Sequence, residues 1–249
     1  LPAGQTAEQQ KKRLALLARL NARHLEKNPA EASLSARIQS YELAYRMQMS
    51  APEAVDLDQE TAETQTLYGL DRPISSYFGR QCLLARRLVE RGVRFVQIYS
   101  GGAHNDANWD AHGNLEKNHN FHAGNTDKPI AGLIEDLKQR GMLDRTLVVW
   151  TTEFGRTPFN KSANHPGREH HNLCFSSWMA GGGIKGGIVH GASDEHGILT
   201  AGDAVHTHDL NATMLHMLGI DHERLTYRHA GRDFRLTDVH GRVIHDVLA

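Results

Sequence analysis

Cysteine and aromatic residues are scarce in this chain of 249 residues. It has two cysteines, and Phe, Trp and Tyr together make up 6% of it. Cys82 and Cys174 form no CxxC pair, so neither a disulfide framework nor a zinc site built on thiolates is supported. A single Cys82–Cys174 disulfide and two separate buried thiols both remain open, and the second is favoured.

The chain also lacks a charge excess and a long apolar run. Its formal net charge is −1, which gives no whole-chain attraction toward nucleic acid. No apolar segment approaches the roughly 20 residues of a membrane-spanning helix. We therefore expect no nucleic-acid partner and no membrane span, in a globular chain long enough for one large domain or two small ones.

Histidine is abundant instead. The chain has 17 histidines, of which four lie between His104 and His122 and three between His165 and His171. Neutral imidazole is the commonest nitrogen ligand for metals in proteins, although many of the 17 are expected to be ordinary surface residues. The two groups of histidines are therefore the first places to look for a metal site.

Hydrophobic periodicity predicts an alternation of helices, strands and polar loops. The predicted helices span residues 6–27, 31–49, 74–92, 127–140 and 208–218, with 53–67 as a surface segment. The predicted strands span residues 93–99, 146–151, 175–180 and 187–190, and long polar loops span 100–125 and 152–172. This order is typical of an open α/β sheet, in which ligands collect beyond the carboxyl ends of the strands. We expect a mainly helical segment over 1–92 and an α/β portion over 93–249.

The first candidate site is the run from His104 to Asn114, which contains Asp106, Asp110 and His112. Two carboxylates and two imidazoles within nine residues suit zinc, manganese or, with more oxygen donors, calcium. The alternative is a solvated polar loop in which Asn, Asp and Gly only form turns.

Two further candidates follow later predicted strands. TEFGRTP places Glu153 at the end of a hydrophobic strand and Arg156 three residues later, and a guanidinium can bind an oxyanion through two hydrogen bonds. The alternative is a surface ion pair. In GREHH, adjacent histidines point in different directions, so at most one of His170 and His171 is expected to bind a metal.

Several longer segments carry a family resemblance. NTDKPIAGLIEDLKQRG leading into DRTLVVWTTEFG, and VHTHDLNATMLHMLGID, resemble segments of sulfatases and phosphodiesterases. WDAHGN, TEFGRTP, GREHH and WMAGGGIKGG together resemble the DUF1501 family, over most of residues 35–240. The resemblance implies the three-layer α/β/α sheet of the alkaline phosphatase/sulfatase superfamily, of which this chain is expected to be the C-terminal portion.

The same resemblance implies roles for individual residues. The metal-binding positions of the superfamily correspond to Asp110, His112, Glu153 and His170 in this chain. Arg156 and Arg168 are the candidates for holding a phosphate or sulfate oxygen. There are two departures. Phe154 stands where the superfamily has a histidine, and residues 1–92 contain no strand with a metal carboxylate and a nucleophile. The sequence begins at Leu1 without a signal peptide, so a fragment or a mature chain is expected.

These observations favour metal-dependent hydrolysis of a phosphate or sulfate ester, on a small molecule or a glycan. The nucleophile is expected in an N-terminal part not included here, and an extracytoplasmic location is implied by the resemblance. The alternative is a degenerate, non-catalytic domain that binds metal or glycan. A metal-dependent peptidase is disfavoured because no HExxH motif is present.

Overall fold

The computed structural model describes residues 4, 6–28, 32–101, 108–160, 164 and 166–249. The chain divides into two compact units, Leu1–Asp56 and Leu57–Ala249. Within the described ranges, no helix combines the length and the hydropathy that crossing a bilayer requires.

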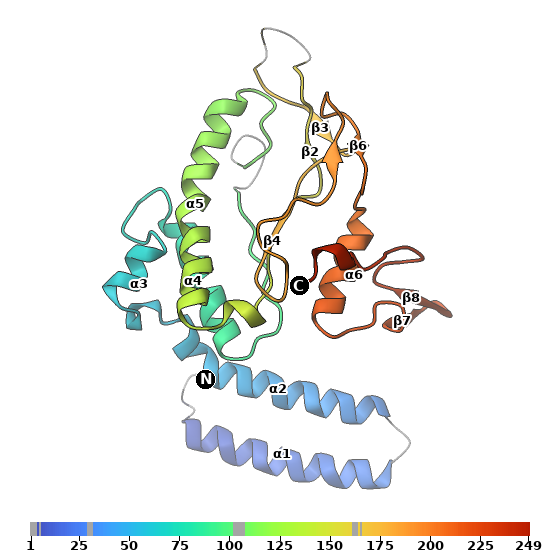
Figure 1. Cartoon of the computed structure of the whole chain (residues 1–249). Coiled ribbons are helices and arrows are strands. Elements are labelled where there is room, and N and C mark those ends of the chain that lie inside the picture. Colours follow the sequence, from blue (N-terminus) through green and yellow to red (C-terminus); the bar gives the residue numbers. More distant parts are fainter. Residues whose placement is uncertain (1–3, 5, 29–31, 102–107, 161–163, 165) are drawn as a thin grey trace. The chain divides into compact units, whose positions relative to one another are not determined.

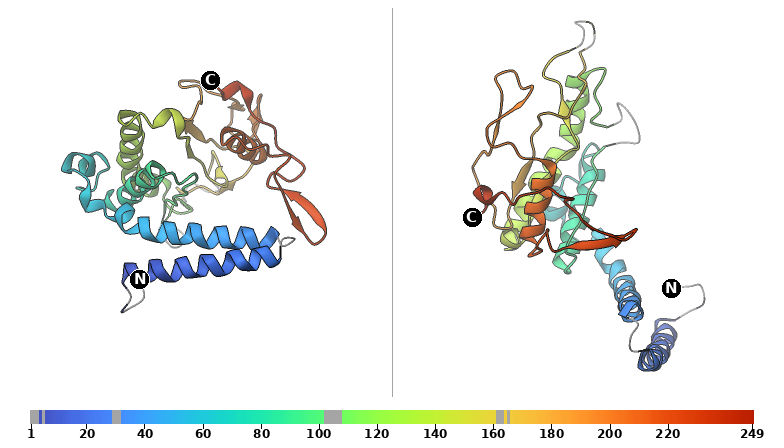
Figure 2. Two further views of the ribbon diagram at one scale, coloured as in Figure 1. Left: turned by 90° about the horizontal axis from the view of Figure 1, so that it is seen from below. Right: turned by 90° about the vertical axis from the view of Figure 1, so that its right-hand side faces the viewer.

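The first unit is a helical hairpin of α1 (Ala7–Lys27) and α2 (Ala32–Val55), which lie side by side (Figures 1 and 2). The Thr6 hydroxyl accepts a hydrogen bond from the backbone of Gln9, and the Gln9 side chain accepts one from the backbone of Thr6, so α1 begins with a capping box. Both expected helices are confirmed. The second helix was expected to end at residue 49, but α2 continues to Val55, because Pro52 removes one backbone hydrogen bond without ending the helix.

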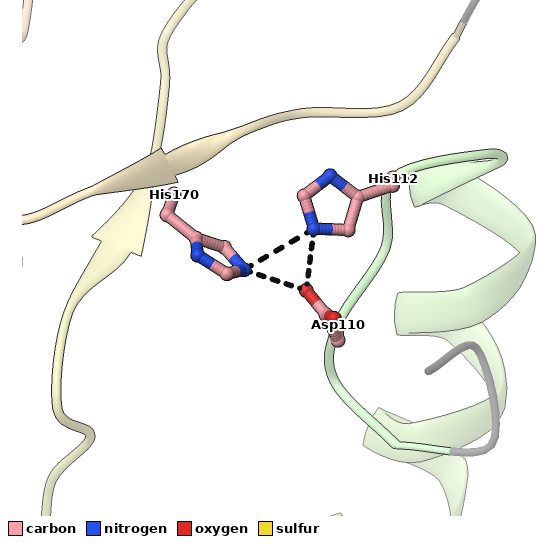
Figure 3. A group of neighbouring side chains, drawn as sticks. All are labelled: Asp110, His112 and His170. Atoms are coloured by element: carbon pink, nitrogen blue, oxygen red, sulfur yellow. Dashed lines mark hydrogen bonds and ion pairs between the residues drawn. The ribbon is translucent and has the colours of Figure 1, made fainter. Parts of the chain in front are cut away.

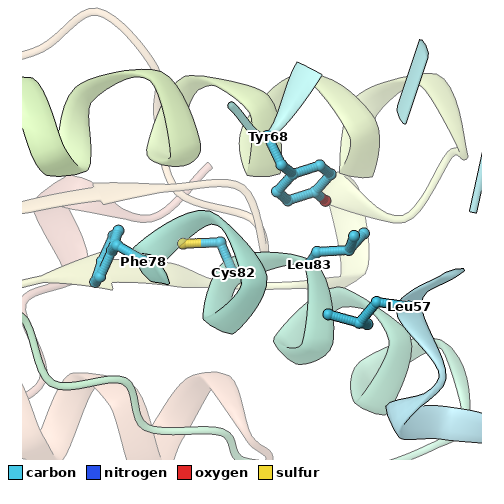
Figure 4. Packing of buried hydrophobic residues seen from close by; sticks show 5 residues of the cluster. All are labelled: Leu57, Tyr68, Phe78, Cys82 and Leu83. Atoms are coloured by element: carbon cyan, nitrogen blue, oxygen red, sulfur yellow. The ribbon is translucent and has the colours of Figure 1, made fainter. Parts of the chain in front are cut away.

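The hydrophobic core of the second unit is formed mainly by helices. These are η1 (Leu57–Gln59), α3 (Ala62–Leu67), α4 (Ser76–Glu90) and α5 (Leu115–Gln139), with α4 and α5 side by side (Figure 1). Leu57, Tyr68, Phe78, Cys82 and Leu83 form the buried cluster (Figure 4). Residues 53–67 were expected at the surface, but Leu57 is 6% exposed because η1 packs on α4.

Burial raises the pKa of the Cys82 thiol to about 12, so this thiol is inert.

The helix expected at 127–140 is confirmed, but it begins twelve residues earlier than the sequence indicates. Residues 115–125, expected to be loop, form the first turns of α5, and the Asn114 side chain accepts a hydrogen bond from the Lys117 backbone as its cap. Asn, His and Gly are weak helix formers, so propensity alone hides this part of the helix. The remaining helical elements are η3 (Leu143–Arg145), α6 (Thr207–Met217) and η4 (His245–Val247).

The strands form small antiparallel pairs. The pairs are β1 (Val148–Trp150) with β4 (Trp178–Ala180), β2 (Gly155–Arg156) with β3 (His170–His171), β5 (Ala192–Ser193) with β6 (Thr200–Ala201), and β7 (Thr226–His229) with β8 (Arg232–Arg235). The strands expected near 146–151 and 175–180 are thus confirmed, in the register Val149↔Met179. The described residues show a mixture of helices and two-stranded antiparallel sheets.

Two expected strands are wrong. Residues 93–99 and 187–190 form no strand in the structure. Phe95 is 65% and Tyr99 is 77% exposed, so the apolar run is not the middle of a buried sheet. Branched and aromatic side chains favour an extended backbone, but a strand also needs a partner with which to form hydrogen bonds, and the described residues offer none here.

A buried network of charges joins α4 to α5 and η1. The Arg86 side chain is 1% exposed and forms ion pairs with Glu60 at 2.7 Å, Glu90 at 2.7 Å and Asp136 at 2.9 Å. Asp136 also accepts a hydrogen bond from the Tyr68 hydroxyl at 2.9 Å. Burial raises the pKa of Glu60, but its hydrogen bonds with arginines outweigh this and leave the pKa lowered. Glu60 is therefore ionised within this network.

We expect Arg86→Met to lower the free energy of unfolding by about 3–5 kcal/mol, because it leaves buried carboxylates without a counter-charge. Arg80→Met is the matched control, since Arg80 lies on the same helix but is exposed; it should change stability by less than about 0.5 kcal/mol. Urea unfolding measures both. Equal effects of the two substitutions would show that the network does not stabilise the fold.

Candidate metal centre

Backbone hydrogen bonds bring the two candidate loops together. The Arg168 N–H donates to the carbonyl of Ala111 at 3.0 Å, and the Leu115 N–H donates to the carbonyl of Pro166 at 3.3 Å. Gly167 lies so close to the neighbouring loop that an added Cβ would clash with the carbonyl oxygen of His112. Segments more than 50 residues apart in the sequence are thereby held in direct contact.

Two imidazole rings converge on a single oxygen atom of Asp110 (Figure 3). The Nε2 atoms of His112 and His170 lie 2.9 Å and 3.0 Å from Oδ1 of Asp110, and 3.2 Å from each other. One ligand atom from each of the three residues lies within 4.8 Å of the others. Three of the four residues predicted to bind metal therefore meet, although they come from two separate loops.

The triangle of ligand atoms has nearly the size that a small divalent ion requires. For bonds of about 2.0–2.1 Å in tetrahedral geometry, ligand atoms are roughly 3.3 Å apart. The observed separations of 2.9, 3.0 and 3.2 Å need to widen by only a few tenths of an ångström. The side chains of His112 and His170 are 42% and 49% exposed, so an ion can reach the site from solvent.

Arg156 is the fourth member of the cluster. The β2–β3 pairing places it directly across from His170, and its Nη2 donates to Oδ1 of Asp110 at 2.6 Å and to the carbonyl of Trp109 at 3.2 Å. Partial burial raises the pKa of Asp110, but hydrogen bonds from Arg156 and His170 outweigh it, so the pKa is lowered. The carboxylate is therefore ionised and ready to bind a cation.

Two neighbours fix the orientations of the histidine rings. Oε2 of Glu169 lies 3.5 Å from Nδ1 of His112, on the opposite side of the ring from Asp110. Such a carboxylate favours the tautomer that leaves Nε2 free to bind metal. The Phe154 ring packs on His170 with centroids 4.2 Å apart. Sequence reasoning missed the role of Glu169, although it lies within the GREHH motif.

Helix α5 holds the loop that carries Asp110. The Trp109 ring packs against the rings of His119 and His122, at 5.3 Å and 5.2 Å between centroids. The Asn118 side chain donates to the carbonyl of Asn108 at 2.8 Å. Burial lowers the pKa values of His119 and His122, although each gains a hydrogen bond to the loop backbone. These positioning residues were missed because this part of α5 was expected to be loop; the spacing of three between the histidines was the available signal.

The other predicted site residues lie elsewhere. The Glu153 carboxylate is exposed, accepts a hydrogen bond from the Thr152 hydroxyl at 3.0 Å, and does not belong to the converging group. The Arg168 side chain donates to the carbonyl of Gly167 at 3.1 Å. His171 is 7% exposed and its Nε2 contacts the carbonyl oxygen of Ile198, so only His170 of the adjacent pair faces the cluster.

Two remaining expectations concern residues outside this cluster. His104 and Asp106 lie outside the described residues, so their suggested part in the site stays a prediction. Cys82 is buried and Cys174 is half-buried, and both are free thiols, so the disulfide alternative is wrong.

The comparison with known families agrees with the sequence motifs. The model of the DUF1501 family, described as a protein of unknown function, matches residues 1–248. This chain therefore belongs to the DUF1501 family. Neither the curated proteins nor the solved structures contain a significant match to it.

Replacement of Gly167 tests whether contact between the loops assembles the site. We expect Gly167→Ala to abolish zinc binding in calorimetric titration, because the new Cβ pushes the His170 loop away from the His112 backbone. Gly186→Ala is the control, since nothing lies within 4 Å of a Cβ at that position. Tight zinc binding by the Gly167→Ala variant would contradict the proposed assembly.

Acidification tests the nature of the ligands. Two imidazoles must be neutral to bind a metal, while the lowered pKa of Asp110 keeps its carboxylate ionised through the same range. We expect affinity for zinc to fall by more than about tenfold between roughly pH 8 and pH 5. The His112→Ala variant should lose most of the affinity at the higher pH. Affinity that is independent of pH would argue against histidine ligands.

Proposed function

We propose that this chain binds one divalent metal ion through Asp110, His112 and His170, and that the site serves the hydrolysis of phosphate or sulfate esters. The convergence of three ligand atoms within 4.8 Å carries the proposal. Three protein ligands leave a coordination position open, as catalytic sites do. The exposure of both histidines agrees with access for a substrate.

The donor set favours zinc or manganese over calcium. Calcium takes six to eight oxygen ligands, whereas two of the three donors here are imidazole nitrogens. One carboxylate and two imidazoles suit a transition metal or zinc. Among the three ions that the sequence suggested, we therefore propose zinc first and manganese second.

Arg156 is the proposed ligand for a substrate oxygen. Its Nη2 is engaged by Asp110, while its Nη1 is buried and has no hydrogen-bond partner among the described residues. A guanidinium binds tetrahedral oxyanions through paired N–H groups, and a substrate that displaces the side chains covering Nη1 would find this donor unpaired. A bound divalent ion would act as a Lewis acid on the ester oxygen. We propose Arg168 as a second, weaker contact to the substrate.

The wider assignment follows from the sequence resemblance. We propose that the chain is related to the alkaline phosphatase/sulfatase superfamily and that the nucleophile is supplied by a segment outside this sequence. Substrates would be small-molecule or glycan esters, and the location extracytoplasmic. Glu153 retains its proposed role as a metal ligand only if its loop moves, because its carboxylate now faces Thr152.

A non-catalytic binding domain is the second candidate, and Phe154 is the observation that favours it. Where the superfamily resemblance calls for a metal-binding histidine, the Phe154 ring packs on His170 instead. A site with fewer ligands can still bind a metal and an anionic glycan without turning over an ester. The two candidates predict the same metal binding but differ in turnover.

Turnover of aryl phosphate and aryl sulfate esters separates these candidates. We expect none from the chain alone with zinc or manganese, and turnover once it is joined to the proposed N-terminal segment. Arg156→Lys should then lower kcat/KM by about 10²-fold, because lysine cannot reproduce the paired N–H groups. Arg145→Lys, on η3, is the control. If the chain binds metal but turns over neither ester, both alone and when joined to the N-terminal segment, the result would support the non-catalytic candidate.

A further inference from the structure

Helix α1 is strongly basic, although the whole chain is nearly neutral. Its 21 residues contain six Lys or Arg and two Glu, whereas the net charge of the chain is −1. Among the described residues of α1, one ion pair is present, between Lys12 and Glu8 at 3.9 Å, and both side chains are largely exposed. The whole-chain charge that argued against anionic partners therefore averages over a local excess of positive charge.

The leucines of α1 lie on two different sides of the helix. Leu14 and Leu25 are half-buried, as are Leu34 and Ile38 of α2, and these side chains mark the sides on which the two helices face each other. Leu16, Leu17 and Leu20 remain 51%, 50% and 51% exposed. Figure 2 shows the hairpin from two directions. The hairpin thus leaves an apolar strip of α1 uncovered.

Cations flank this uncovered strip. Arg13 lies one turn before Leu17, and Arg23 and His24 lie one turn after Leu20, so they are neighbours on the helix surface. Long basic side chains beside leucines can rest their methylene stems on an apolar layer while their charges reach toward phosphates. Leucines on one side and Lys or Arg around them are the composition of helices that lie in a membrane interface.

We propose that α1 binds the surface of an anionic lipid bilayer, with Leu16, Leu17 and Leu20 inserted between the headgroups. Charge complementarity favours this occupant over a second copy of the chain. Two copies meeting through this strip would bring the arginines of one α1 close to those of the other. Each helix has only two glutamates to offset six Lys or Arg residues. An anionic membrane supplies negative charge along the whole helix.

Vesicle co-sedimentation of the complete chain tests the proposal. We expect binding to vesicles of phosphatidylcholine with phosphatidylglycerol, little binding to phosphatidylcholine alone, and release at high salt. Leu17→Gln with Leu20→Gln should reduce binding by more than about tenfold, as should Arg13→Gln with Arg23→Gln. Leu43→Gln, at a side chain of α2 that is 53% exposed, is the matched control and should bind normally.

Circular dichroism shows whether each variant keeps its helices, independently of the lipid. Equal binding to neutral and anionic vesicles would overturn the proposal, as would the absence of binding to both. Self-association of the chain that disappears in the Leu17→Gln, Leu20→Gln variant would show that a second copy covers the strip. If the unmodified chain binds anionic vesicles but not zinc, the metal proposal fails and this one stands.

Discussion

The site depends on one ionised oxygen, Oδ1 of Asp110. It lies within 3.0 Å of an imidazole nitrogen of the nearby His112, and of nitrogens of His170 and Arg156 that come from a different part of the chain. A protonated carboxyl would offer these groups much less attraction, and the contact with Arg156 helps to keep the pKa of Asp110 low. The same contact has a cost, because Arg156 and a metal ion compete for this oxygen.

Helix α5 connects the core of the second unit to this oxygen. At one end of the helix, Asp136 lies in the buried network around Arg86. Near the other end, the rings of His119 and His122 pack on Trp109, the residue before Asp110. The buried charges therefore fix the helix, and the helix in turn fixes the position of the Asp110 carboxylate. This coupling gives the charged network a role in the site as well as in stability.

The sequence predicted the features that depend on local patterns. Leucine spacing predicted the long helices, and the histidine-rich segments drew attention to the two loops, while the family resemblance implied Asp110, His112 and His170, together with Glu153, as metal ligands. The predictions from sequence failed where contacts between distant segments determine the structure. Residues 93–99 have the composition of a buried strand but lack a partner in the described structure. Glu153 was placed by analogy with a strand end, yet its side chain faces Thr152. Glu169 contacts the His112 ring and Phe154 packs on the His170 ring. No rule on sequence spacing reveals where these rings lie.

X-ray absorption spectroscopy of the chain loaded with one equivalent of zinc tests the central claim most directly, because it reports the ligand atoms themselves. Our account predicts nitrogen and oxygen neighbours at about 2.0–2.2 Å, with the outer-shell signals of two imidazole rings. One imidazole should disappear in His112→Ala and the other in His170→Ala. A shell of oxygen atoms alone, or a spectrum unchanged by both substitutions, would contradict the assignment of Asp110, His112 and His170 as the metal site.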